Sequence, residues 1–120
     1  MANQIVWVDI PVKDLDRAIK FYSAVLGAQV HKEEIPGAPI GVLPHSEGDV
    51  GGCLVQHSGD ESSVKGPLLY LNANGRLDQA VAAVAANGGK VLEPKHSIGP
   101  HGYRAIVLDS EGNRVALHSE

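Results

Sequence analysis

The stretch that decides the fold is Ile5–Gly27, I-V-W-V-D-I-P-V-K-D-L-D-R-A-I-K-F-Y-S-A-V-L-G. Its first part alternates between apolar and other residues, the period of a strand with one apolar face made of Val6, Val8, Ile10 and Val12. Asp14 then suits the cap of a helix that Gly27 ends. Within that helix one stripe is apolar at three- and four-residue steps: Leu15, Ala18, Ile19, Tyr22 and Leu26. The stretch predicts a strand that runs directly into an amphipathic helix.

A second copy of this unit begins near Leu68. The segment L-D-R-A-I at 15–19 returns as L-D-Q-A-V at 77–81, again after a short apolar strand and before a glycine stop. Two copies of half the chain length are too few for a solenoid, so we expect two modules packed on each other. Each module should run strand, helix, strand, strand, strand, with module one at about 1–60 and module two at about 66–120. The predicted fold class is α+β with mixed sheets, in a single domain covering 1–120.

The composition limits the classes of partner. With 120 residues the chain is long enough for one domain, and with only 4% aromatic residues its core must consist of Val, Leu, Ile and Ala. A net charge of −4 without a Lys/Arg cluster argues against binding nucleic acid or an anionic membrane. Cys53 is the only cysteine, and no segment has the length of a membrane span, so we expect a cytoplasmic protein in a reducing compartment.

Two motifs carry a resemblance to a known family. D-L-D-R-A-I-K-F-Y at 14–22 opens the first helix, and D-S-E-G-N-R-V-A-L-H at 109–118 forms a turn followed by the last strand. With the order of elements, they resemble the glyoxalase/bleomycin-resistance/extradiol-dioxygenase (vicinal oxygen chelate) superfamily over essentially the whole chain. The resemblance implies paired βαβββ modules whose curved mixed sheets enclose a cleft. It also implies, in many members, a divalent metal held by two His and two Glu.

The residues at the implied metal positions differ from that pattern. The resemblance places a metal-binding His where this chain has Trp7, and a second ligand at the opening of module two, where it has Leu68. The implied glutamate position falls on Ala116, and its counterpart in module one falls near Cys53. Three of these side chains have no ligand atoms, and a single thiol does not make a site for a hard cation. We therefore expect no inherited metal site and no other cofactor.

Alternation along the strands predicts which side chains line the cleft. Apolar walls with a few polar groups are typical of small-molecule sites, so a small-molecule ligand is the expected partner. If Asp9 and Arg104 are buried, we expect them to pair or to contact the ligand, because an unpaired buried charge is unstable; alternatively, both lie solvated at the rim of the cleft. Trp7 either stacks on a ligand or fills the space that a metal would occupy, and we favour the second. The predicted lining is Trp7, Asp9, Cys53, Leu68, Tyr70, Asn72, Arg104, Ile106, Ala116 and His118.

The six histidines show no metal-ligand spacing. His118 should share the inner face with Ala116, and His57 should share it in module one. We expect His31, His45 and His96 on the surface or in loops. We expect a strand over residues 90–93. The glycine- and proline-rich segment 96–102 that follows it is either a lid with His101 near its tip or an ordinary connection, and the latter is favoured.

Three functions remain compatible with these features. The first is a bleomycin-resistance-like protein that binds a small organic molecule in an apolar cleft, which the missing ligands favour. The second is an enzyme of the same superfamily, a lyase, isomerase or dioxygenase with relocated metal ligands. The third is a degenerate structural or regulatory module. Relatives of this length commonly pair, so we expect a homodimer.

Overall fold

The computed structural model describes residues 3–36, 38–56 and 61–120. These residues form two βαβββ modules, as predicted. Module one consists of β1 (Trp7–Pro11), α1 (Leu15–Leu26), β2 (His31–Ile35), β3 (Ala38–Val42) and β4 (Gly51–Val55). Module two consists of β5 (Leu69–Asn72), α2 (Leu77–Ala86), β6 (Lys90–Ser97), a short 3-10 turn (Gly99–His101), β7 (Tyr103–Leu108) and β8 (Arg114–Ser119).

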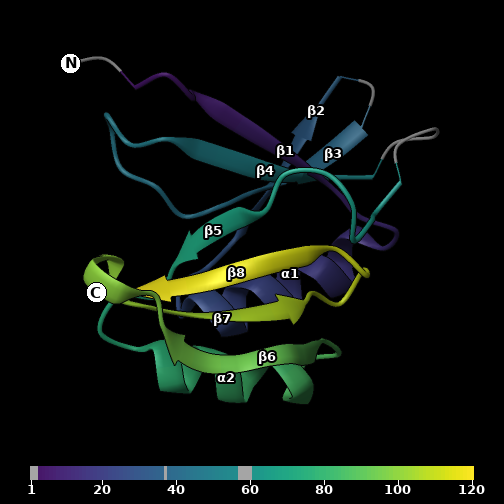
Figure 1. The fold of residues 1–120 in the computed structure, drawn as a ribbon. Helices are drawn as coiled ribbons and strands as arrows, with labels where there is room; N and C mark the ends of the chain where they lie inside the picture. Colours follow the sequence, from purple (N-terminus) through teal and green to yellow (C-terminus); the bar gives the residue numbers. More distant parts are fainter. Residues whose placement is uncertain (1–2, 37, 57–60) are drawn as a thin grey trace.

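Each module builds one mixed sheet with the same topology. Sheet A has the order β1-β4-β3-β2 and sheet B the order β5-β8-β7-β6, among the described residues. In both sheets the first strand pairs in parallel with the last, and the other pairs are antiparallel. Helix α1 packs against β3, β4 and α2, whereas α2 packs against β6, β7 and β8. Figure 1 shows both helices behind sheet B. The predicted α+β fold of two modules is confirmed, and the face of each sheet opposite its helix is called its inner face below.

Helix α1 begins and ends where its sequence predicts. The Asp14 side chain accepts a hydrogen bond from the backbone N–H of Arg17 at 3.1 Å, which satisfies one free donor of the first turn. Gly27 adopts a left-handed conformation with φ 69° and donates its N–H to Ser23. Between these ends the helix buries Leu15, Ala18, Phe21, Tyr22 and Val25. They join residues of both modules in one contiguous apolar core.

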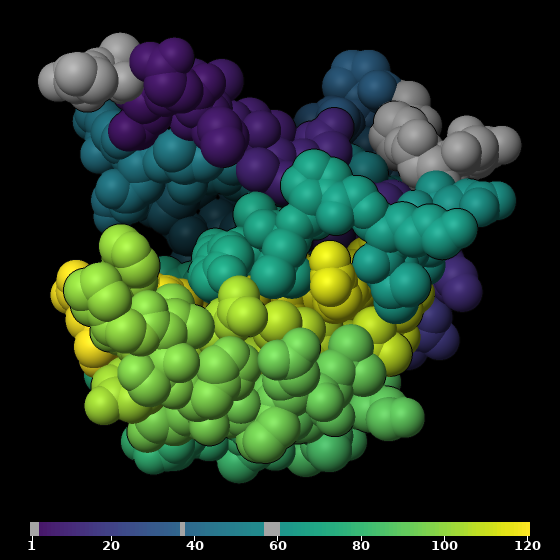
Figure 2. All heavy atoms as spheres, viewed as in Figure 1, coloured from purple at the N-terminus to yellow at the C-terminus, as the bar shows by residue number. Residues whose placement is uncertain are grey.

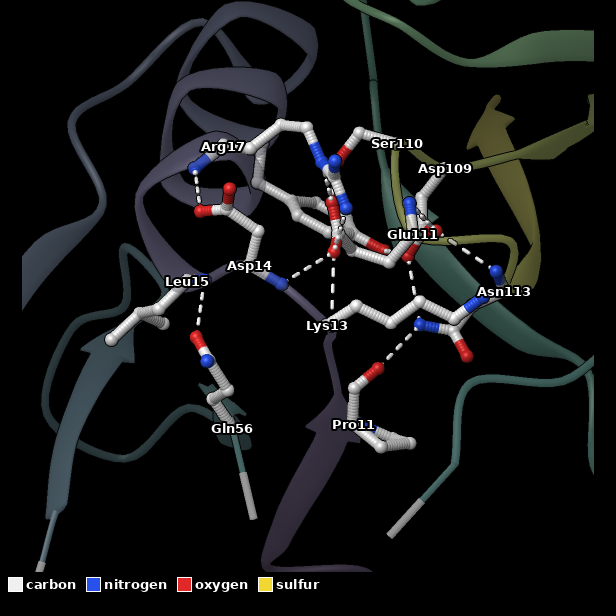
Figure 3. A network of polar contacts seen from close by, with 11 residues as sticks. Pro11, Lys13, Asp14, Leu15, Arg17, Gln56, Asp109, Ser110, Glu111 and Asn113 are labelled. Atoms are coloured by element: carbon white, nitrogen blue, oxygen red, sulfur yellow. Dashed lines mark hydrogen bonds and ion pairs between the residues drawn. The ribbon is translucent and has the colours of Figure 1, made fainter. Parts of the chain in front are cut away.

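A carboxylate of module two holds the start of α1 in module one (Figure 3). Glu111 accepts hydrogen bonds from the backbone N–H groups of Lys13 at 2.9 Å and Asp14 at 2.8 Å. It also accepts from the Arg17 guanidinium at 2.7 and 2.8 Å, and its own side chain is fully buried. Burial alone would raise the pKa of Glu111, but these hydrogen bonds outweigh it and lower that pKa from 4.5 to about 2. The carboxylate therefore stays charged and joins the two modules.

Asp109 continues this junction inside the core. The Tyr22 hydroxyl donates to the Asp109 carboxylate at 2.5 Å. The Asn113 amide donates to the same carboxylate at 3.0 Å and to the carbonyl of Pro11 at 2.8 Å. Burial, followed by the charge of Asp109, raises the pKa of Tyr22 well above its ordinary value. The turn 109–113 thus connects the last strands of module two to β1 and α1 of module one.

Two local predictions were wrong. Strand β6 runs to Ser97, although the sequence suggested an end near residue 93. It is an edge strand with register shifts on both sides of Glu93, and such a position tolerates Pro94, which has no N–H to donate. Val6 was expected to face the helix but is 74% exposed, because β1 begins only at Trp7. No helix in the described ranges has both the length and the apolar character required to cross a membrane.

Candidate functional site

The inner face of module one carries polar groups that bind one another. The Trp7 indole N–H donates to Asp9 at 3.1 Å, and the Cys53 thiol donates to the same carboxylate oxygen at 3.3 Å. These contacts follow from the register, since Asp9 lies opposite Cys53 in the β1–β4 pair. The Trp7 ring meets His45 edge-on, with ring centroids 5.9 Å apart. The predicted residues of this face therefore form a cluster whose hydrogen bonds are internal.

Trp7 lies over a glycine of the neighbouring strand. A Cβ atom built on Gly51 would come within 2.7 Å of the indole ring, so only glycine leaves room for it there. The Trp7 side chain is nevertheless 43% exposed. Trp7 is therefore not enclosed by the protein, and part of the ring remains open to solvent.

The residues at the implied metal positions do not fit a divalent cation. Trp7, Leu68 and Ala116 present an indole and two alkyl groups, none of which can ligate a metal. Burial raises the pKa of the Cys53 thiol, so it stays protonated near neutral pH, whereas a metal ligand must be the thiolate. Elsewhere in the described ranges, no three or more His, Cys, Asp or Glu side chains gather closely enough to hold a metal.

The inner face of module two is organised differently, as a row across all four strands of sheet B. His96 lies opposite Arg104 in the β6–β7 pair, Arg104 lies opposite His118 in the β7–β8 pair, and His118 lies opposite Asn72 in the β8–β5 pair. Directly opposed residues project from the same face of a sheet. One guanidinium, two imidazoles and an amide therefore stand side by side on the inner face.

Arg104 is bound only by neutral partners in the described part of the chain. Its guanidinium donates to the Tyr70 hydroxyl at 2.5 Å and to Nε2 of His96 at 3.0 Å. His96 Nδ1 lies 2.9 Å from the Pro94 carbonyl, which can only accept, so Nδ1 carries the proton and Nε2 is free to accept. Arg104 does not pair with Asp9, which is exposed and bound to Trp7 and Cys53 on the other module.

A cavity lies directly beside this row. Its volume is about 530 Å³, and it is lined by Tyr70, Ile98, His101, Arg104 and His118. The Tyr70 and His118 rings meet at a centroid distance of 6.3 Å, and His118 Nε2 donates to the carbonyl of His101 at 2.7 Å. The structure thus brings together four of the predicted residues, Tyr70, Arg104, His118 and His101. That hydrogen bond ties the 3-10 turn, the segment considered as a lid, to β8.

The other predicted residues lie elsewhere. Tyr70 and Asn72 also line a hollow of about 390 Å³ between the modules, which Figure 2 shows between β4 (teal) and the β5 and Gly99–His101 segments. Asp9 and Leu68 line a third cavity of about 470 Å³ between β1 and β5. Three predicted residues are buried and offer almost no surface: Cys53 at 4%, Ile106 at 4% and Ala116 at 0% exposure. His57 lies outside the described residues.

Sequence reasoning missed His96. It was expected on the surface or in a loop because β6 was expected to end near Glu93, whereas the strand continues through two register shifts and places His96 opposite Arg104. The sequence does show that Pro94, whose carbonyl sets the tautomer of His96, stands two residues before it. The sequence does not show the irregular register that aligns His96 with β7.

Two βαβββ modules packed on each other define the class of fold, and comparison with known proteins agrees. The family model described as Glyoxalase/Bleomycin resistance protein/Dioxygenase superfamily matches residues 4–117. The chain belongs to this superfamily.

Individual relatives are similar over nearly the whole chain. A glyoxylase-like domain-containing protein of Didymella fabae is 33% identical over 124 residues, which cover 96% of this chain and 92% of that protein. The crystal structure of a glyoxalase/bleomycin resistance protein from Albidiferax ferrireducens T118 superposes with a TM-score of 0.76 at 21% identity, covering 98% and 99% of the two chains. A glyoxalase I mutant from Zea mays gives a TM-score of 0.70 at 23% identity, and the match covers 93% of this chain but 44% of that one.

Proposed function

We propose that this protein binds a small organic molecule, without an inherited metal, at the inner face of module two. The observation that carries the proposal is the cavity of about 530 Å³ in which Tyr70 and Ile98 supply apolar surface and Arg104 and His118 supply polar groups. Small-molecule sites combine mostly apolar walls with a few convergent polar groups, and this cavity has that composition.

The neighbouring hollow extends the available space. Tyr70 lines both the cavity beside Arg104 and the hollow of about 390 Å³ between the modules. The walls of that hollow include Val8, Leu43, Leu69 and Leu71. A ligand held near Arg104 can therefore extend its apolar body past Tyr70 toward module one.

The test is a screen of the isotope-labelled protein by NMR with planar and aliphatic organic molecules, both neutral and charged. Binding predicts saturable shifts of the amides of Tyr70, Arg104 and His118. A parallel thermal-shift series with divalent cations addresses the enzyme alternative. Stoichiometric metal with several degrees of stabilisation would replace the proposal with a metal-dependent enzyme, and the absence of any saturable shift would favour a structural module.

The proposal includes a homodimer in the cytoplasm. β1 is an edge strand of sheet A, and its surroundings expose Ile5 at 63%, Val6 at 74% and Val50 at 42%. Exposed apolar residues gathered on an edge support pairing of two copies. Sedimentation is expected to give twice the chain mass of 12.6 kDa, and a mass near 12.6 kDa would contradict the dimer. The cytoplasmic location rests on the single cysteine of the sequence.

A further inference from the structure

We infer that the inner face of module two is an oxyanion subsite, built to hold the carboxylate or phosphate group of an otherwise apolar ligand. The inference rests on the proposed binding function and adds the chemical class of the ligand and its orientation. The observation behind it is the row of His96, Arg104, His118 and Asn72 across sheet B.

Arg104 has both the charge and the free donors that such a group needs. A guanidinium carries five N–H donors, and the described contacts use two of them, to Tyr70 and His96. Both acceptors are neutral, and no carboxylate of the described residues lies within the 4.0 Å that would make an ion pair with Arg104. The positive charge is therefore available to an anion, and a guanidinium can bind two oxygens of one group at once.

The partners of Arg104 hold the guanidinium in place. His96, whose Nδ1 proton points to the Pro94 carbonyl, accepts from one edge through Nε2, and the Tyr70 hydroxyl accepts from another. Because residues of β6 and β5, which lie on either side of β7, hold the side chain, the remaining donors are already oriented before a ligand arrives, which lowers the entropy lost on binding.

The surroundings agree with an anionic group. The cavity lining contains no carboxylate, although the whole chain carries a net charge of −4. Two acidic groups lie near the cavity but outside its lining: Glu93 lies 4.0 Å from His96 Nε2 and is exposed, and Glu120 lines a separate cavity with His101 and His118. The charge of the lining itself is positive, through Arg104, and is thus opposite in sign to that of the whole chain.

The geometry also orients the ligand. Tyr70 stands between Arg104 and the apolar hollow that separates the modules, since it hydrogen-bonds Arg104 and lines both cavities. An anionic group at Arg104 places the apolar body of the ligand against the Tyr70 ring and in the hollow. The expected ligands are therefore aromatic or aliphatic carboxylates, or phosphate monoesters.

The experiment compares matched probes on matched variants. Benzoate and phenyl phosphate are titrated against neutral benzamide by NMR, with wild type, Arg104→Gln, Arg104→Lys and the control Lys20→Gln, which removes one exposed charge from α1. We expect both anions to bind wild type at least tenfold more tightly than benzamide. Arg104→Gln should remove that preference, Arg104→Lys should keep part of it, and Lys20→Gln should change it less than twofold.

The outcomes separate this inference from the function on which it rests. If benzamide binds at Tyr70 as well as the anions do, or if Arg104→Gln weakens all three probes equally, the oxyanion subsite is refuted while the proposed binding function stands. If no probe shifts the amides of this face in wild type, both are refuted. A preference for phenyl phosphate over benzoate, or the reverse, that disappears in Arg104→Gln supports the inference and identifies the anionic group. Unchanged unfolding of Arg104→Gln in urea shows that any loss is local.

Discussion

The two modules follow one plan but differ at two corresponding places. The start of α1 is held by Asp14 in its own module and by Glu111 in the other, whereas Arg76 at the start of α2 makes no capping hydrogen bond. On the inner faces, the Asp9 carboxylate of module one is bound by Trp7 and Cys53 of its own module, whereas module two presents the Arg104 cation without an anionic partner among the described residues. We therefore propose that the two halves divide the tasks: the α1 junction stabilises the fold, and the inner face of module two recognises the ligand.

The largest expected effect is at the α1 junction. Glu111→Ala removes the acceptor for two backbone N–H groups and the partner of Arg17, so it should lower the free energy of unfolding by about 3 to 4 kcal/mol. The matched control is Asp78→Ala on α2, whose exposed ion pair with Lys95 contributes less than about 1 kcal/mol. Urea denaturation measures both. Equal losses would show that the two helix starts are equivalent after all.

The contribution of the Glu111 carboxylate to the free energy of unfolding should depend on pH. Glu111 has a folded-state pKa of about 2 against an ordinary 4.5, so its contribution is complete above pH 4.5 and disappears as the pH falls through about 2. The change is on the order of 3 kcal/mol. Urea titrations of wild type and Glu111→Gln between pH 6 and pH 2 should converge as the pH falls. Parallel curves would assign the acid sensitivity to other carboxylates.

A smaller effect tests the packing on module one. Gly51→Val forces the Trp7 ring off β4, because an added Cβ would lie 2.7 Å from it. We expect a loss of about 1 to 2 kcal/mol and a shift of Trp fluorescence. The loss should vanish when Trp7 is also replaced by Ala. If Trp7→Ala does not relieve it, the indole lies elsewhere.

The smallest effect concerns the Cys53 thiol. Burial, and to a lesser extent the neighbouring Asp9, raises its pKa, so it should react with a thiol reagent several-fold more slowly than glutathione at pH 7.5. Asp9→Asn should speed the reaction slightly, since burial remains the larger cause. Timed alkylation followed by mass spectrometry measures both rates. Reaction as fast as that of glutathione would mean that the inner face of module one is open.

The sequence predicts what local patterns determine. The bounds of α1 follow from Asp14 and Gly27, and period-two alternation correctly placed Tyr70, Arg104 and His118 together. The role of Glu111 could not be predicted, because it depends on how a turn of module two docks on a helix of module one. For a related reason the sequence could not decide whether Asp9 and Arg104 pair, and in the structure they do not. Alternation assigns side chains to a face, but only tertiary packing decides which of them meet.

The most direct test of the division between the two inner faces is a titration with benzoate followed on the Arg104 Nε–H and Trp7 indole N–H signals of one NMR spectrum. These two groups report on module two and module one respectively, and both are hydrogen-bonded within their own module. The predicted result is a saturable shift of the Arg104 signal while the Trp7 signal stays in place. A saturable shift of Trp7 with an unmoved Arg104 would contradict the assignment of recognition to module two.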